Sequence, residues 1–185
     1  MKKYVLVAGG AGFIGSNLCD FLLKRGDKVI CVDNLITSSG KNIAKYLSLE
    51  NFTFIEQDIC QPLKKGFSKI EEIYDLASPA DPNLDSPLSY MSHPFETMLV
   101  NTTGLWNLCE LALKYKAKIL FASTSEVYGD PLVPVQKETY RGNVSTTGPR
   151  SVYDESKRFG ETIVSAFVRK KSLDGRIVRI FNTYG

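Results

Sequence analysis

Tyr153 and Lys157 lie four residues apart in the segment YDESK, a spacing that brings both side chains to one face of a helix. A tyrosine phenol has an ordinary pKa of about 10, so it acts as a base near neutral pH only where its surroundings favour the phenolate. A nearby ammonium group favours the phenolate. The pair therefore predicts proton transfer to and from a substrate hydroxyl, although an ordinary surface pair on a helix is the alternative.

Thr124 adds a hydroxyl group to this candidate chemistry. It ends the apolar run in FASTSEVYGD and is followed by Ser125 and Glu126. At the carboxyl end of a strand, a threonine hydroxyl can hold a substrate alcohol while Tyr153 removes its proton and a hydride leaves. The pattern predicts an alcohol oxidation, with the carboxylate of Glu126 nearby for a further step.

A glycine-rich turn predicts that a nucleotide cofactor receives the hydride. The segment GGAGFIG spaces Gly9, Gly12 and Gly15 three residues apart, between an apolar run and an amphipathic segment. Such glycines let the backbone approach a pyrophosphate, and the following helix supplies N–H donors. Asp33 ends the next apolar run, where its carboxylate can accept both ribose hydroxyls and would repel the extra phosphate of NADP. We expect NAD; a turn that only packs and an aspartate that only caps are the alternative.

The elements that must position these residues alternate along the chain. Short β-branched runs at 3–8, 28–32, 52–55, 72–77, 118–123 and 176–181 predict strands, and helical spacing predicts helices at 13–25, 41–48, 94–115 and 151–171. This alternation predicts an α/β fold, a doubly wound parallel sheet with both faces covered. The proline-rich segment 78–94 is expected to be a long loop over the carboxyl edge, where such sheets bind ligands.

Length and composition favour one soluble domain. The chain has 185 residues, of which 43% are apolar, and a net charge of +3. We expect a single NAD-binding domain over residues 1–185, with no second domain. Because the charge is small and the basic clusters are short, no nucleic-acid partner is expected. The four cysteines form no CxxC pair and there is one histidine, so no metal site is expected.

The amino-terminal segment MKKYVLVAGGAGFIG resembles a signal peptide only in its positive start and apolar stretch. Its glycine spacing and its lack of a small-residue cleavage site argue against secretion. We therefore expect a cytoplasmic protein with reduced thiols and no membrane partner.

The segments GGAGFIG, STSEVYGD, GPRSVYDESKRFGE and RIFNTYG together resemble the extended short-chain dehydrogenase/reductase superfamily, that is, the NAD-dependent epimerase/dehydratase family. Within it, the chain is most similar to the UDP-glucuronate decarboxylases, also called UDP-xylose synthases. The resemblance covers residues 1–185. It implies a Rossmann-type fold, NAD, a nucleotide-sugar substrate, a homodimer of the full-length protein, and a substrate-binding carboxyl-terminal portion absent from this chain.

The resemblance also implies a reaction: oxidation of UDP-glucuronate at C4, loss of CO2 from the resulting β-keto acid, protonation at C5, and reduction by NADH to UDP-xylose. It assigns Thr124, Tyr153 and Lys157 to the oxidation, and Ser125 and Glu126 to the later steps. The related 4,6-dehydratases carry Asp-Glu after the threonine, so Ser125 favours decarboxylation. A nucleotide-sugar 4-epimerase or 4,6-dehydratase remains an alternative, as does a non-catalytic NAD-binding sensor or scaffold, which would not need a poised phenol.

Further ligand positions follow from the same resemblance. Besides the glycines and Asp33, the cofactor contacts it implies are Phe13, Ile14, Asn34, Thr37, Ser38, Asp58, Ile59, Leu76, Ser78, Tyr153, Lys157 and Thr183. The substrate contacts it implies are Pro79, Ala80, Glu126 and Asn182. One departure is the longer loop after Ser78, whose Asp81 and Asp85 are unexpected beside an anionic sugar.

Overall fold

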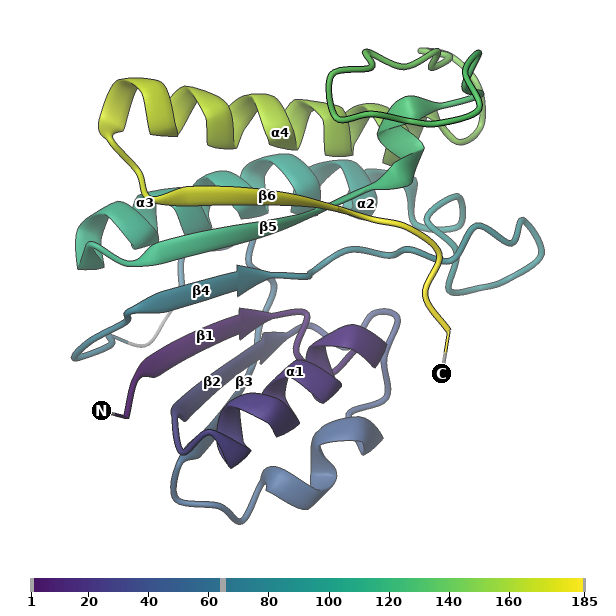
Figure 1. Ribbon diagram of the computed structural model, residues 1–185. Coiled ribbons are helices and arrows are strands. Elements are labelled where there is room, and N and C mark those ends of the chain that lie inside the picture. Colours follow the sequence, from purple (N-terminus) through teal and green to yellow (C-terminus); the bar gives the residue numbers. More distant parts are fainter. Residues whose placement is uncertain (1, 64–65, 185) are drawn as a thin grey trace.

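The computed structural model describes residues 2–63 and 66–184, and it contains a parallel six-stranded sheet (Figure 1). The strand order is β3-β2-β1-β4-β5-β6, so the chain winds outward in both directions from β1. The strands are β1 Tyr4–Ala8, β2 Lys28–Asp33, β3 Phe52–Glu56, β4 Glu72–Asp75, β5 Lys118–Thr124 and β6 Gly175–Ile180. The predicted doubly wound parallel sheet is confirmed.

Helices cover both faces of the sheet. One face packs against α3 Leu105–Tyr115 and α4 Ser151–Lys171, and the short α2 Pro94–Leu99 packs against α4. The other face packs against α1 Phe13–Lys24 and the short 3-10 helix η1 Lys41–Tyr46 (Figure 1). Residues 5–8 of the central strand β1 are fully buried. A strand buried on both faces has no polar alternation, which is why this segment is continuously apolar in the sequence.

The predicted helix at 94–115 is interrupted, which periodicity alone did not indicate. Between α2 and α3 lies the π-helical turn η2 Val100–Gly104. A Cβ at Gly104 would lie 2.8 Å from Ile59 Cγ1, so the glycine permits close packing there. The wide turn also buries Asn101, whose amide donates to Ser78 and Ser156. Such turns are frequent at functional sites.

Two other predicted elements differ at their ends. The segment predicted as a helix at 41–48 forms only the 3-10 helix η1, and β4 ends at Asp75 rather than at residue 77. Beyond Asp75 the chain turns toward the glycine loop, where the N–H of Leu76 donates to the carbonyl of Ala8.

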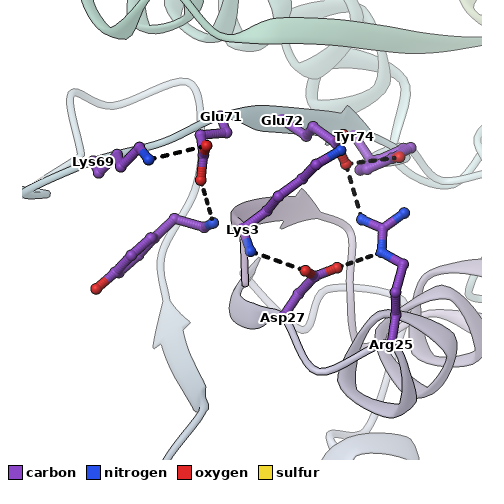
Figure 2. Close-up of polar contacts among 8 residues, drawn as sticks. Lys3, Arg25, Asp27, Lys69, Glu71, Glu72 and Tyr74 are labelled. Carbon is purple, nitrogen blue, oxygen red and sulfur yellow. Dashed lines mark hydrogen bonds and ion pairs between the residues drawn. The ribbon is translucent and has the colours of Figure 1, made fainter. Parts of the chain in front are cut away.

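A charged network ties the amino ends of β1 and β4 to the end of α1 (Figure 2). Asp27 accepts the backbone N–H of Lys3 at 3.0 Å and pairs with Arg25. Glu72 pairs with Arg25 and with the side chain of Lys3. Asp27 is buried, so its hydrogen bonds offset the cost of desolvating its charge. The network lies at the opposite edge of the sheet from the carboxyl ends, and we assign it to stability.

Asp27→Ala should lower the free energy of unfolding of the full-length protein by about 2 kcal/mol, because the N–H of Lys3 and the guanidinium of Arg25 lose a buried acceptor. Urea denaturation measures the loss. The control is Lys24→Ala, which removes an exposed i,i+4 pair with Asp20 and should cost little stability, because solvent screens the pair. Equal losses would contradict a buried network.

Candidate active site

The glycine turn between β1 and α1 packs tightly against the end of β4. Gly9 has a φ of 73°, and a Cβ there would lie 2.7 Å from the backbone nitrogen of Ala77. A Cβ on Gly15 would overlap the carbonyl oxygen of Gly9. Only glycine fits both positions, and the result is a helix that begins directly against the turn. This is the geometry in which helix N–H groups can face a phosphate.

Asp33 ties this turn to the end of β2. Its Oδ2 accepts the N–H of Ala11 at 3.0 Å, and its Oδ1 accepts the N–H of Leu35 at 2.9 Å and the hydroxyl of Ser38 at 3.3 Å. A carboxylate offers about four acceptor sites, so Asp33 can still accept donors from a bound molecule. The capping role weighed in the sequence is therefore real, and it leaves the ligand role open.

An open pocket lies at the carboxyl ends of β1, β2, β3 and β4. Its wall brings together many of the positions predicted to bind the cofactor or the substrate, although they are dispersed in the sequence. These are Gly9, Gly12, Asp33, Asn34, Thr37, Ser38, Asp58, Ile59, Leu76, Ser78 and Pro79.

Other predicted positions do not line this pocket. Phe13 and Ile14 are exposed at the start of α1, and Ala80 is exposed in the loop after β4. Asn182 and Thr183 lie in an exposed segment after β6. The pocket is therefore assembled from the β1, β2, β3 and β4 ends, and the segment after β6 takes no part in its wall.

Tyr153 is buried on α4, near the end of β5. Burial raises the pKa of its phenol to about 12, the hydrogen bond with Thr124 opposes this rise, and the negative charge of Glu126 adds to it. From the sequence, we expect the ammonium of Lys157 to favour the phenolate. Within the chain itself burial has the larger effect, and the phenol is neutral near neutral pH.

Lys157 is buried one helical turn beyond Tyr153. Its Nζ donates to the carbonyl of Ala122 at 2.8 Å and lies 4.8 Å from the centroid of the Phe121 ring and 5.8 Å from that of Tyr153. Burial lowers the pKa of this ammonium to about 8, and the charge of Asp75 opposes the fall. The predicted pair thus shares one helix face, as its spacing required.

Glu126 lies in the 3-10 helix η3 Ser125–Tyr128, which Thr124 caps by accepting the N–H of Glu126 at 3.2 Å. Its Oε2 pairs with Nη2 of Arg150 at 2.9 Å, and Nε of Arg150 donates to the hydroxyl of Tyr90 at 2.9 Å. The Tyr90 ring stacks on Tyr153, with centroids 4.7 Å apart and an interplanar angle of 11°. A continuous chain of contacts therefore joins the carboxylate to the phenol.

Several residues of this site were not identified from the sequence. Arg150 precedes α4, and Tyr90 lies in the proline-rich loop, so only the fold brings them together. Asn101 links Ser78 in the pocket wall to Ser156 on α4. No local pattern distinguishes Asn101 from the polar residues Thr102 and Thr103 that follow it.

Asp81, one of the two acidic loop residues noted in the sequence, serves the loop itself. Asp81 accepts the N–H of Asn83 at 2.9 Å, and hydrogen bonds with Ser86 and Asn83 hold the pKa of its carboxyl below the usual value. The backbone of Asp81 also forms an isolated parallel β-bridge with that of Ser89. This use of its charge in a turn explains how an acidic residue fits in the loop.

No group of three or more histidine, cysteine, aspartate or glutamate side chains that could hold a metal ion occurs in residues 2–63 and 66–184. Among these described residues, every helix is too short or too polar to span a bilayer. All four cysteines are free thiols.

Residues 5–185 match the model of the NAD dependent epimerase/dehydratase family. The chain is 44% identical over 184 residues to UDP-glucuronic acid decarboxylase 1 of Danio rerio, covering 100% of this chain and 42% of that protein. It is 46% identical over 182 residues to UDP-glucuronic acid decarboxylase 6 of Arabidopsis thaliana, covering 98% and 51%. The chain thus spans about half the length of these curated relatives.

Solved structures give the same relationship at lower identity. A dTDP-glucose 4,6-dehydratase from Streptomyces venezuelae with NAD bound is 26% identical, with a TM-score of 0.81, covering 98% of this chain and 56% of that one. A UDP-glucose 4-epimerase from Thermotoga maritima with UDP-glucose is 28% identical, with a TM-score of 0.79 and the same coverage.

Proposed function

Because the chain belongs to the NAD dependent epimerase/dehydratase family, we propose that the full-length protein uses NAD to convert UDP-glucuronate to UDP-xylose and CO2. The observation that carries the proposal is the meeting of Thr124, Glu126 and Tyr153 at the end of β5, where a carboxylate stands beside the oxidation residues. The similarity to decarboxylases from an animal and a plant supports this choice within the family.

The pocket at the glycine turn fits the cofactor. The close approach permitted at Gly9 and Gly15 suits a pyrophosphate, and Asp33 has acceptor capacity for a ribose. When bound, NAD accepts a hydride from the sugar and later returns it, and its positive nicotinamide ring joins Lys157 in favouring the phenolate of Tyr153.

Different side chains of the site then serve the separate proton transfers of the reaction. Thr124 orients the C4 hydroxyl, and Tyr153 takes its proton as the C–H hydride leaves. The resulting β-keto acid breaks its C5–C6 bond, and the electron pair becomes an enolate as CO2 departs. Glu126 and Ser125 serve protonation at C5, after which Tyr153 returns its proton to the C4 oxygen when hydride is restored.

NAD should bind at least about tenfold more tightly than NADP, because two like charges about 4 Å apart near a protein surface repel by about 4 kcal/mol. Calorimetry with both cofactors tests this, and Asp33→Asn should reduce the preference. The control is Asp58→Asn, at the expected adenine edge of the pocket, which should change both affinities alike. Equal binding of both cofactors by the unmodified protein would exclude Asp33 as the ribose ligand.

Product analysis separates the proposed reaction from its alternatives. Full-length protein incubated with UDP-glucuronate and NAD should form UDP-xylose, identified by NMR. A 4-epimerase would instead form UDP-galacturonate without CO2, and a sensor or scaffold would bind NAD without forming a product. The cytoplasmic location, the homodimer and the lack of nucleic-acid and membrane partners remain predictions from the sequence.

A further inference from the structure

Asp75, the last residue of β4, is a buried carboxylate that the proposed reaction does not use. Its Oδ1 accepts the N–H of Ala77 at 3.3 Å. Its Oδ2 is buried and has no hydrogen-bond partner. A buried carboxylate is costly unless a positive charge faces it, so its surroundings should contain a cation.

The pairing of β4 with β5 indicates that this cation is the ammonium of Lys157. Asp75 pairs with Phe121 of β5, and paired residues on adjacent strands point to the same face of a sheet. The ammonium of Lys157 lies 4.8 Å from the centroid of the Phe121 ring and donates to the next residue of β5, Ala122. Asp75 and Phe121 therefore lie on the same face of the sheet, and the ammonium of Lys157 lies over the Phe121 ring on that face.

Within residues 2–63 and 66–184, the titratable groups that interact electrostatically with this carboxylate are Lys157 on α4, Cys60 after β3 and Cys109 on α3. Burial raises the pKa of both thiols to about 12, so both are neutral across the working range. Lys157 faces Asp75 and the ring of Tyr153.

The two charges support each other. Burial raises the pKa of Asp75 to about 6, and Lys157 opposes the rise. Burial lowers the pKa of Lys157 to about 8, and Asp75 opposes the fall. Between these values both groups are charged, and removal of either favours the neutral form of the other.

We propose that Asp75 is a positioning residue that keeps Lys157 charged beside Tyr153 as its buried counter-charge. The catalytic consequence rests on the proposed function, since it is the ammonium of Lys157 that favours the phenolate. The charge pair itself requires neither substrate nor turnover. It can therefore be tested separately from the reaction.

The first test is an NMR titration of the Asp75 carboxyl carbon in the full-length protein, with its signal assigned by its loss in Asp75→Asn. The pKa should be near 6 and should rise in Lys157→Met. Lys171→Met, which removes an exposed lysine at the end of α4, should leave it unchanged. An unchanged Asp75 pKa in Lys157→Met would overturn the pairing. This test keeps Asp75 in place, so it does not depend on whether Asp75→Asn folds well.

The second test is the pH profile of kcat. Asp75→Asn should move the acidic limb to higher pH by about one pH unit, a tenfold change in proton affinity, because a less charged Lys157 leaves Tyr153 harder to deprotonate. Asp154→Asn is a matched control with the opposite sign. It removes another buried carboxylate, whose charge raises the pKa of Tyr153. The acidic limb of the kcat profile of Asp154→Asn should therefore move to lower pH.

The outcomes are distinguishable. If the Asp75 pKa rises in Lys157→Met but the acidic limb of the kcat profile does not move in Asp75→Asn, the positioning role is overturned and the proposed function is left intact. If the Asp75 pKa rises in Lys157→Met but the unmodified protein forms no UDP-xylose, the result supports the charge pair and counts against the proposed function.

Discussion

Tyr153→Phe should reduce kcat of the full-length protein by about 10²- to 10⁴-fold and leave NAD affinity near that of the unmodified protein. The substitution removes only the oxygen that exchanges the proton with the C4 hydroxyl. It keeps the ring that stacks on Tyr90, so the loop and α4 retain their packing. Steady-state product formation gives kcat, and calorimetry gives the NAD affinity.

Tyr115→Phe is the matched control for this substitution. It removes a phenol oxygen that donates to the carbonyl of Phe67, at the far end of α3 from the site, and should leave kcat nearly unchanged. If Tyr153→Phe retained most of its rate while the control behaved as expected, another group would have to be the base.

Glu126→Gln should separate the first chemical step from the later ones. The amide keeps the size of the side chain and loses the charge that pairs with Arg150. Because Thr124, Tyr153 and Lys157 remain, oxidation at C4 should proceed, whereas UDP-xylose should form about 10²- to 10⁴-fold more slowly. Stopped-flow absorbance of bound NADH, followed beside CO2 release, resolves the two stages.

Arg150→Met shows whether the carboxylate acts directly or only through its ion pair. It breaks the same ion pair and leaves the charge of Glu126 in place. A selective loss after oxidation in Glu126→Gln, larger than that in Arg150→Met, is the result we expect. An equal loss at every step in Glu126→Gln would make this carboxylate a positioning residue and weaken the decarboxylase assignment.

Local sequence patterns were sufficient to predict most of the fold. The apolar run of β1 reflects burial on both faces, and the apolar spacing in 151–171 matches α4 at both ends. The glycine spacing predicted the turn at the end of β1, because Gly9 and Gly15 leave no room for a side chain. The π-turn at 100–104 was missed because the apolar spacing over 94–115 was interpreted as one uninterrupted helix.

The site could be predicted only in part, because some of its properties depend on distant contacts. Tyr153 and Lys157 share a helix, so their spacing in the sequence predicts that they are neighbours. The contact between Arg150 and Tyr90 joins residues far apart in the sequence, and no local pattern encodes it. The pKa of Tyr153 likewise depends on burial by surrounding elements, which the spacing of Tyr153 and Lys157 does not reveal.

Asp75 shows the same limit for a single side chain. In EIYDLA it reads as a polar residue near the end of a strand, where a solvated carboxylate is common. The register with Phe121 and the reach of Lys157 from α4 turn it into a buried charge. Neither relation is visible before the strands are paired.

Isotope labelling tests most directly the claim that decarboxylation proceeds through reversible oxidation at C4. Full-length protein is given UDP-glucuronate carrying deuterium at C4 in ordinary water and, separately, unlabelled UDP-glucuronate in deuterium oxide. The account predicts UDP-xylose that retains the C4 deuterium in the first reaction and gains one deuterium at C5 in the second, because the hydride returns to its own carbon and the C5 proton comes from solvent. Loss of the C4 label to water, or a product that keeps its carboxylate, would contradict it.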